Sequence, residues 1–141
     1  MKKLNPKRVL EIGTCKGGTL YLRTHVAQPD ATIVSVDLRS GRVSGSYSSL
    51  RTPIYRRFAR RQQRLHLVRA DSHQMDTLEQ VKQLFGGSEI DFLFIDGDHS
   101  YEGVKRDWEM YSTLVRKGGI IAFHDVASNY GDAGKAMLGR D

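Results

Sequence analysis

The sequence predicts an α/β domain whose parallel sheet is covered by helices on both faces. Two observations support this: strand-length apolar runs alternate with helical segments, and each run ends in a small or acidic residue. In parallel sheets the carboxyl ends of the strands share one edge, and ligands bind there. We therefore expect a ligand site near the acids that follow four of these runs, which are Asp37, Asp71, Asp96 and Asp125.

Each expected helix lies between two expected strands and is bounded by turn residues. The expected strands are Arg8–Ile12, Thr32–Val36, His66–Arg69, Asp91–Ile95 and Ile120–Phe123. The expected helices are about Gly18–Gln28, a segment with Thr52 as N-cap and Pro53 next, Thr77–Phe85, and a segment from Ser100 to the Gly118–Gly119 pair.

Two of these helices carry further signals. Asp76 and Glu79 resemble a capping box at the start of the third helix. Val104, Trp108 and Tyr111 form one apolar stripe on the fourth helix, and we interpret the two aromatic residues as core rather than substrate contacts.

The length of 141 residues indicates one domain that spans residues 1–141. No run of 18 apolar residues is present, so the sequence predicts no membrane span. Cys15 is the single cysteine, which excludes an internal disulfide and a cysteine-based zinc site and fits a cytoplasmic location. We interpret Cys15 as a small buried residue rather than a nucleophile.

The formal net charge of +6 is unevenly distributed. The segment from Leu38 to Ala70 holds nine arginines and no Asp or Glu. This run fits either an anionic partner such as nucleic acid or the solvated face of a surface helix. The solvated face is favoured, because no aromatic stacking pattern or nucleic-acid motif accompanies the charge.

The turn after the first strand indicates which kind of cofactor the site can hold. A dinucleotide site calls for glycines at positions 13, 15 and 18, but position 15 is Cys15, whose Cβ obstructs a pyrophosphate. The turn instead suits a ligand without phosphate, such as an adenosyl group that bears an amino acid. Asp37 is placed to accept hydrogen bonds from a ribose diol, and Asp71 and Ser72 to contact adenine. The alternative for any one of these acids is turn or helix capping.

The segments VLEIGTCKGG, IVSVD, RADS, FLFIDGDHSYEGVKRDWEMY and LVRKGGIIAFHD resemble the successive motifs of class I S-adenosylmethionine-dependent methyltransferases. More narrowly, they resemble the group related to cephalosporin-pathway and macrolide-sugar O-methyltransferases, over about residues 8–126. The resemblance implies a Rossmann-like, doubly wound sheet with strand order 3-2-1-4-5. The cofactor-binding residues expected are Glu11, Gly13, Thr14, Gly17, Asp37, Leu38, Asp71, Ser72 and Asp96.

The resemblance also implies catalytic roles after the fourth strand. Asp96 would lie beside the methyl-transfer centre, and His99 would be the general base, unless it only starts a helix. The related group holds Mg²⁺ with an Asp and an acidic pair. Here the corresponding residues are Asp96, His124 and Asp125, so one carboxylate is replaced and Mg²⁺ or another divalent cation is expected.

These features predict methyl transfer to a hydroxyl of a small molecule. The alternatives are a non-catalytic S-adenosylmethionine-binding domain and an RNA-associated methyltransferase. No alternating apolar pattern follows Asp125, so we expect the C-terminal strand 6–7 hairpin of the family to be lacking. That predicts either a truncated domain or a homodimer that covers the exposed edge of the fifth strand.

Overall fold

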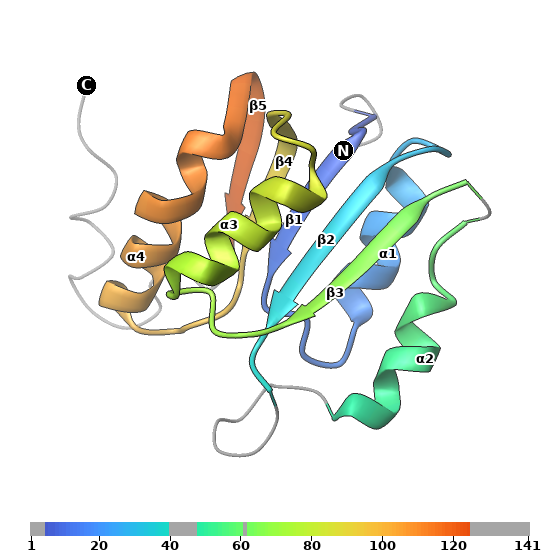
Figure 1. Ribbon diagram of the computed structural model, residues 1–141, viewed down its shortest axis with the longest axis horizontal. Helices are drawn as coiled ribbons and strands as arrows, with labels where there is room; N and C mark the ends of the chain where they lie inside the picture. The colour runs from blue at the N-terminus through green and yellow to red at the C-terminus, as the bar shows by residue number, and fades with distance from the viewer. Residues whose placement is uncertain (1–4, 40–47, 61, 125–141) are drawn as a thin grey trace.

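A computed structural model of the protein describes residues 5–39, 48–60 and 62–124 (Figure 1). It contains a five-stranded parallel sheet in the order β3-β2-β1-β4-β5, which confirms the predicted fold class and strand order. The strands are β1 (Arg8–Ile12), β2 (Thr32–Asp37), β3 (Arg64–Arg69), β4 (Ile90–Ile95) and β5 (Val115–Phe123). The helices are α1 (Gly18–Val26), α2 (Thr52–Arg56), α3 (Met75–Leu84) and α4 (Tyr101–Tyr111), with 3₁₀ turns η1 (Ser49–Arg51) and η2 (Ser112–Leu114).

Helices cover both faces of the sheet because the central strands are apolar on both sides (Figure 1). Alternate residues of a strand point to opposite faces, so Leu10 packs with α3 and α4 while the adjacent Val9 packs with α1 and α2. The same alternation holds along β2 and, in β4, from Phe92 to Ile95. The two cores that result lie on either side of the strands whose ends form the site.

The turn after β1 is pressed against the end of β4. Gly13 has a φ of 92°, and a Cβ at this position would lie 2.0 Å from the backbone oxygen of Asp96. The backbone N–H of Asp96 donates to Ile12 O at 2.8 Å, and that of Gly13 donates to Val36 O at 2.8 Å. Only glycine fits here. Because it has no side chain, the end of β1 can lie close to the ends of β2 and β4.

Two helix starts differ from the sequence prediction. The expected capping box at Asp76 and Glu79 is wrong: α3 begins at Met75 after Gln74, and Glu79 pairs with Lys82 instead. The Asp71 carboxylate accepts from the Gln74 side-chain amide in the turn that precedes α3. Thr52 lies inside α2 rather than capping it, because η1 precedes the helix.

The start of α4 at Ser100 is confirmed, but its expected end is wrong. The helix stops at Tyr111, and Gly118 and Gly119 lie within β5. Gly118 has a φ of 77°, and the β4–β5 register shifts nearby, so the pair forms an irregularity in the strand rather than a helix end.

The packing of three single residues corrects or confirms the sequence interpretation. Tyr111 is fully buried as predicted, whereas Trp108 is 45% exposed and does not belong to the core. Cys15 is exposed rather than buried, with a φ of 46°.

Among the residues that the structure describes, no helix is both long and apolar enough to cross a membrane.

Candidate functional site

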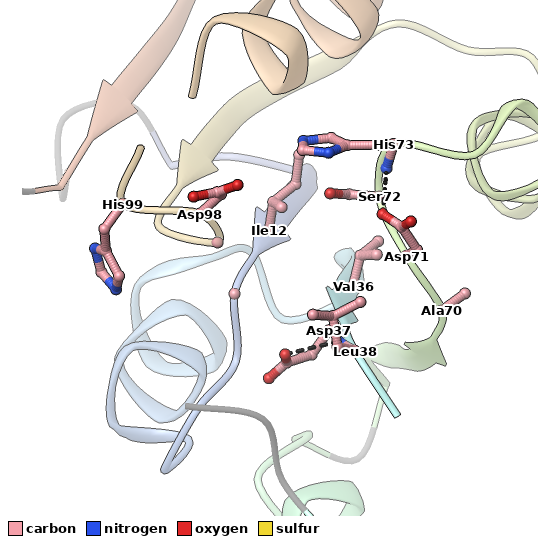
Figure 2. A pocket seen from close by; sticks show the side chains of 12 residues that line it. Ile12, Val36, Asp37, Leu38, Ala70, Asp71, Ser72, His73, Asp98 and His99 are labelled. Carbon is pink, nitrogen blue, oxygen red and sulfur yellow. Dashed lines mark hydrogen bonds between the residues drawn. The ribbon is translucent and has the colours of Figure 1, made fainter. Parts of the chain in front are cut away.

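A cavity of about 490 Å³ opens at the carboxyl edge of the sheet; we call it the edge cavity (Figure 2). This volume is within the usual range for small-molecule sites. Walls come from the ends of β1, β2, β3 and β4, as expected for an open parallel sheet. Six residues predicted for cofactor binding or catalysis line it, namely Gly13, Asp37, Leu38, Asp71, Ser72 and His99.

Asp37 joins the end of β2 to the turn after β1. Its Oδ2 accepts from the backbone N–H groups of Thr14 at 3.1 Å and Cys15 at 2.8 Å, and its Oδ1 accepts from Leu38 N–H at 2.8 Å. Burial raises the pKa of this carboxyl, while these backbone donors partly oppose the shift. The glycine turn and Asp37 therefore form one continuous rim of the edge cavity.

Glu11 lies beneath that rim and does not line the edge cavity. Its side chain is fully buried on the α1 face, and its Oε2 accepts from the Ser35 hydroxyl at 2.8 Å. Burial raises its pKa to about 7, against the opposing influence of the Thr19 and Ser35 hydroxyls and the Arg23 charge. In this position Glu11 supports the turn from below.

Thr14 and Gly17 also shape the turn without lining the edge cavity. The Thr14 hydroxyl lies 2.5 Å from the Ser35 hydroxyl, which extends the buried polar group under the turn. Gly17 has a φ of 79°, and a Cβ there would lie 2.8 Å from the ring of Tyr55 on α2. The Tyr55 hydroxyl donates to Cys15 O at 2.9 Å, so α2 fixes the outer side of the turn.

Asp71 and Ser72, shortly after the end of β3, form the wall of the edge cavity that faces His99 (Figure 2). The Asp71 carboxylate accepts from the His73 N–H and from the Gln74 amide, each at 2.9 Å. Partial burial favours a higher pKa for Asp71, but these donors outweigh it and hold the pKa below its usual value. Asp71 thus caps its own turn and faces the edge cavity at the same time.

The sequence patterns described above did not point to His73 and Asp107, which form a polar pair at this wall. His73 lines the edge cavity, and its Nε2 lies 3.3 Å from Asp107 Oδ1 and 3.2 Å from Gly103 O. Asp107 is fully buried, and burial raises its pKa, with the His73 charge acting in the other direction. The available signal was the position of Asp107 four residues before Tyr111, on the same helix face.

The predicted catalytic residues lie at the end of β4 and divide between two environments. His99 is exposed and lines the edge cavity on the side opposite Asp71 (Figure 2). Asp96 is largely buried, does not line that cavity, and has His124 Nδ1 at 3.2 Å from its Oδ1. Asp98 accepts from Ser100 N–H at 2.8 Å, and this bond lowers its pKa, so it helps to start α4.

The predicted metal ligands are only partly brought together. Asp96 and His124 are adjacent, whereas Asp125 lies outside the described residues. Within residues 5–39, 48–60 and 62–124, no group of three His, Cys, Asp or Glu side chains is arranged to hold a metal ion. The described part of this candidate site supplies one carboxylate and one imidazole, whereas Mg²⁺ prefers oxygen ligands.

Known proteins resemble this chain both in sequence and in fold. A family model described as a methyltransferase domain matches residues 10–126, which include the whole edge cavity. A curated relative, an uncharacterized protein of Acanthamoeba polyphaga mimivirus, is 56% identical over 36 residues, or 26% of this chain and 16% of that protein.

Solved structures share the fold. The MycE methyltransferase from the mycinamycin biosynthetic pathway, in complex with Mg and SAH, aligns over 89% of this chain with a TM-score of 0.64 and 19% identity. Its complex with Mg, SAH and mycinamycin VI aligns over 84% of this chain with a TM-score of 0.60 and 21% identity. A Clostridium acetobutulicum trans-2-enoyl-CoA reductase with NAD aligns over 88% of this chain, with a TM-score of 0.54 and 12% identity. This chain spans only 29%, 28% and 49% of those three chains, respectively.

Proposed function

The chain belongs to the family of methyltransferase domains, and on this premise we propose that it binds S-adenosylmethionine and methylates a hydroxyl of a small molecule. The observation that carries the proposal is the rim that the glycine turn and Asp37 form around the edge cavity. A phosphate-free nucleoside fits this rim, because exposed Cys15 and its left-handed backbone stand where a dinucleotide site needs glycine.

In this proposal the ribose lies on Asp37. A carboxylate offers about four acceptor positions, and backbone N–H groups occupy three of them. Oδ1 accepts only from Leu38 N–H among these bonds, so it is the oxygen with room for a ribose hydroxyl. Adenine lies against Asp71 and Ser72, and the methionine end lies near Gly13 and the end of β4.

His99 is the proposed general base for the transfer. The acceptor oxygen attacks the methyl carbon, the carbon–sulfur bond breaks with its electron pair going to sulfur, and S-adenosylhomocysteine leaves. The hydroxyl proton passes to the His99 imidazole. His99 is suited to this role because it is exposed at the edge cavity on the β4 side, away from the proposed adenine wall (Figure 2).

Calorimetric titration with S-adenosylhomocysteine tests cofactor binding. We expect saturable one-site binding that Asp37→Ala weakens by at least tenfold, since it removes the ribose acceptor and loosens the turn. Asp30→Ala is the matched control, because Asp30 is an exposed acid paired with Lys7 away from the edge cavity. Undetectable wild-type binding at hundreds of micromolar, or full-strength binding by Asp37→Ala, would contradict the proposal.

A separate assay tests the transfer step. S-adenosylhomocysteine release is measured with panels of sugar-like and catechol-like hydroxyl acceptors, and we expect His99→Gln to lower turnover by about a hundredfold. His25→Gln, an exposed histidine on α1, should retain full activity. Cofactor binding with no turnover on any acceptor would favour the non-catalytic binding domain instead.

A further inference from the structure

A second cavity, of about 420 Å³, lies at the β3 edge of the sheet; we call it the arginine cavity. Its residues come from the segment after β2, from α2, from β3 and from α3. Three of them are arginines on different segments, namely Arg39, Arg56 and Arg69. The cavity adjoins the edge cavity through Ala70, which lines both.

Among the described residues that line the arginine cavity, three are arginines and none is Asp or Glu, so this lining is positive. Besides the three guanidinium groups, its polar side chains are the Thr52 hydroxyl and the Gln80 amide. The chain from residue 38 to residue 70 contains no Asp or Glu, so this segment brings no acid to neutralise the cluster. Asp37 lies outside this lining, but the charge of Arg69 acts on its carboxyl and favours a lower pKa there.

One arginine is held in place by a backbone contact. The Nε of Arg39 donates to Arg69 O at 2.9 Å, which fixes the Arg39 guanidinium against the carboxyl end of β3. Arg56 approaches from α2, whose Tyr55 is buried against the sheet and so anchors the helix. Arg39 and Arg56 therefore lie on segments whose positions are fixed by contacts with the sheet.

We propose that the arginine cavity binds the phosphate group of a phosphorylated small molecule. A guanidinium is a planar fork that matches phosphate oxygens, and three such groups on different segments suit a tetrahedral dianion better than a planar monoanionic carboxylate. The arginines lie on separate segments around one cavity rather than along a continuous positive stripe, which favours a small ligand over an extended polyanion. The proposal does not depend on methyl transfer.

Calorimetric titration with inorganic pyrophosphate at low ionic strength tests the site. We expect one saturable site, weakened about tenfold by Arg56→Gln and by Arg39→Gln, because each loses a charge-assisted hydrogen bond. Arg57→Gln is the matched control: Arg57 is adjacent in sequence and exposed but does not line the cavity, so its affinity should match wild type. Pyrophosphate should also raise the melting temperature of wild type more than that of Arg56→Gln.

Three results would overturn the assignment. The first is equal affinity in wild type and Arg56→Gln, or an equal loss in Arg57→Gln, since either means diffuse attraction. The second is competition by acetate at matched ionic strength as effective as that by inorganic phosphate, since this removes the preference for phosphate. The third is binding of a twelve-nucleotide RNA at least a hundredfold tighter than pyrophosphate, with a steep salt dependence, since this makes the surface a nucleic-acid interface.

Discussion

The Nε2 of His73 lies 3.3 Å from Oδ1 of Asp107, whose side chain is fully buried in α4. The same Nε2 lies 3.2 Å from Gly103 O. In the tautomer that carries its hydrogen on Nε2, His73 donates to the Gly103 carbonyl, with the Asp107 carboxyl beside it. The pair fastens the loop after β3, which forms one wall of the edge cavity, to the helix that follows β4.

We expect His73→Ala to lower the free energy of unfolding by about 2 kcal/mol at pH 7, because it removes the imidazole that lies beside the buried Asp107 carboxyl and the Gly103 carbonyl. The double variant His73→Ala/Asp107→Asn should recover part of that loss, since it also removes the buried carboxylate. Urea denaturation of the wild type, both single variants and the double variant measures the coupling. Strictly additive effects would mean that the two side chains do not interact.

Glu11 gives the fold a distinct pH dependence. Its pKa is about 7 in the folded protein against 4.5 as the unperturbed value, so between these pH values the folded state keeps a proton that the unfolded state has lost. Stability from this group is therefore greatest below pH 4.5 and falls as the pH rises toward 7, by at most about 3 kcal/mol.

Glu11→Gln removes this titration, so we expect its stability relative to wild type to increase from pH 5 to pH 8. Urea denaturation at unit pH steps measures the difference. Glu79→Gln, at an exposed position on α3, should leave the wild-type slope unchanged. Parallel stability curves for Glu11→Gln and wild type would show that Glu11 titrates normally.

We expect Gly13→Ala to destabilise the fold by several kcal/mol or to prevent folding. The added Cβ would meet Asp96 O at 2.0 Å, and the φ of 92° disfavours any side chain. Gly18→Ala is the control: a Cβ there meets nothing within 4 Å, and alanine favours the start of α1. Circular dichroism and thermal melts of both variants separate the two outcomes, and a fully stable Gly13→Ala would refute the close approach.

We expect a homodimer to form through the exposed edge of β5. Within the described ranges β5 pairs only with β4, and Ile120 on this strand is 42% exposed. We expect light scattering after size exclusion to give a dimer mass that Ile120→Lys shifts toward the monomer. Leu50→Lys, at an exposed position in η1, should not change the mass. A monodisperse wild-type monomer would rule out the dimer.

Local sequence patterns were enough to predict the sheet and the edge on which the site lies. Apolar runs of strand length and the glycine turn at Gly13 are local signals, and strand length and turn chemistry depend on neighbouring residues. Five of the predicted cofactor-binding residues therefore line the edge cavity, and Asp37 reaches the turn as expected. The strand order came from the family resemblance rather than from local signals.

Which side chains face the edge cavity and which support it depends on packing between distant segments, which local patterns do not encode. The apolar stripe of α4 predicted Trp108 as a core residue. In the packed structure the buried face of α4 instead carries Gly103, Asp107 and Tyr111. His73 and Asp107 meet because β3 and α4 are brought together by the sheet, and no local spacing encodes that contact. The arginine cavity arises likewise, because Arg39, Arg56 and Arg69 are distant in sequence and converge only where the segments pack.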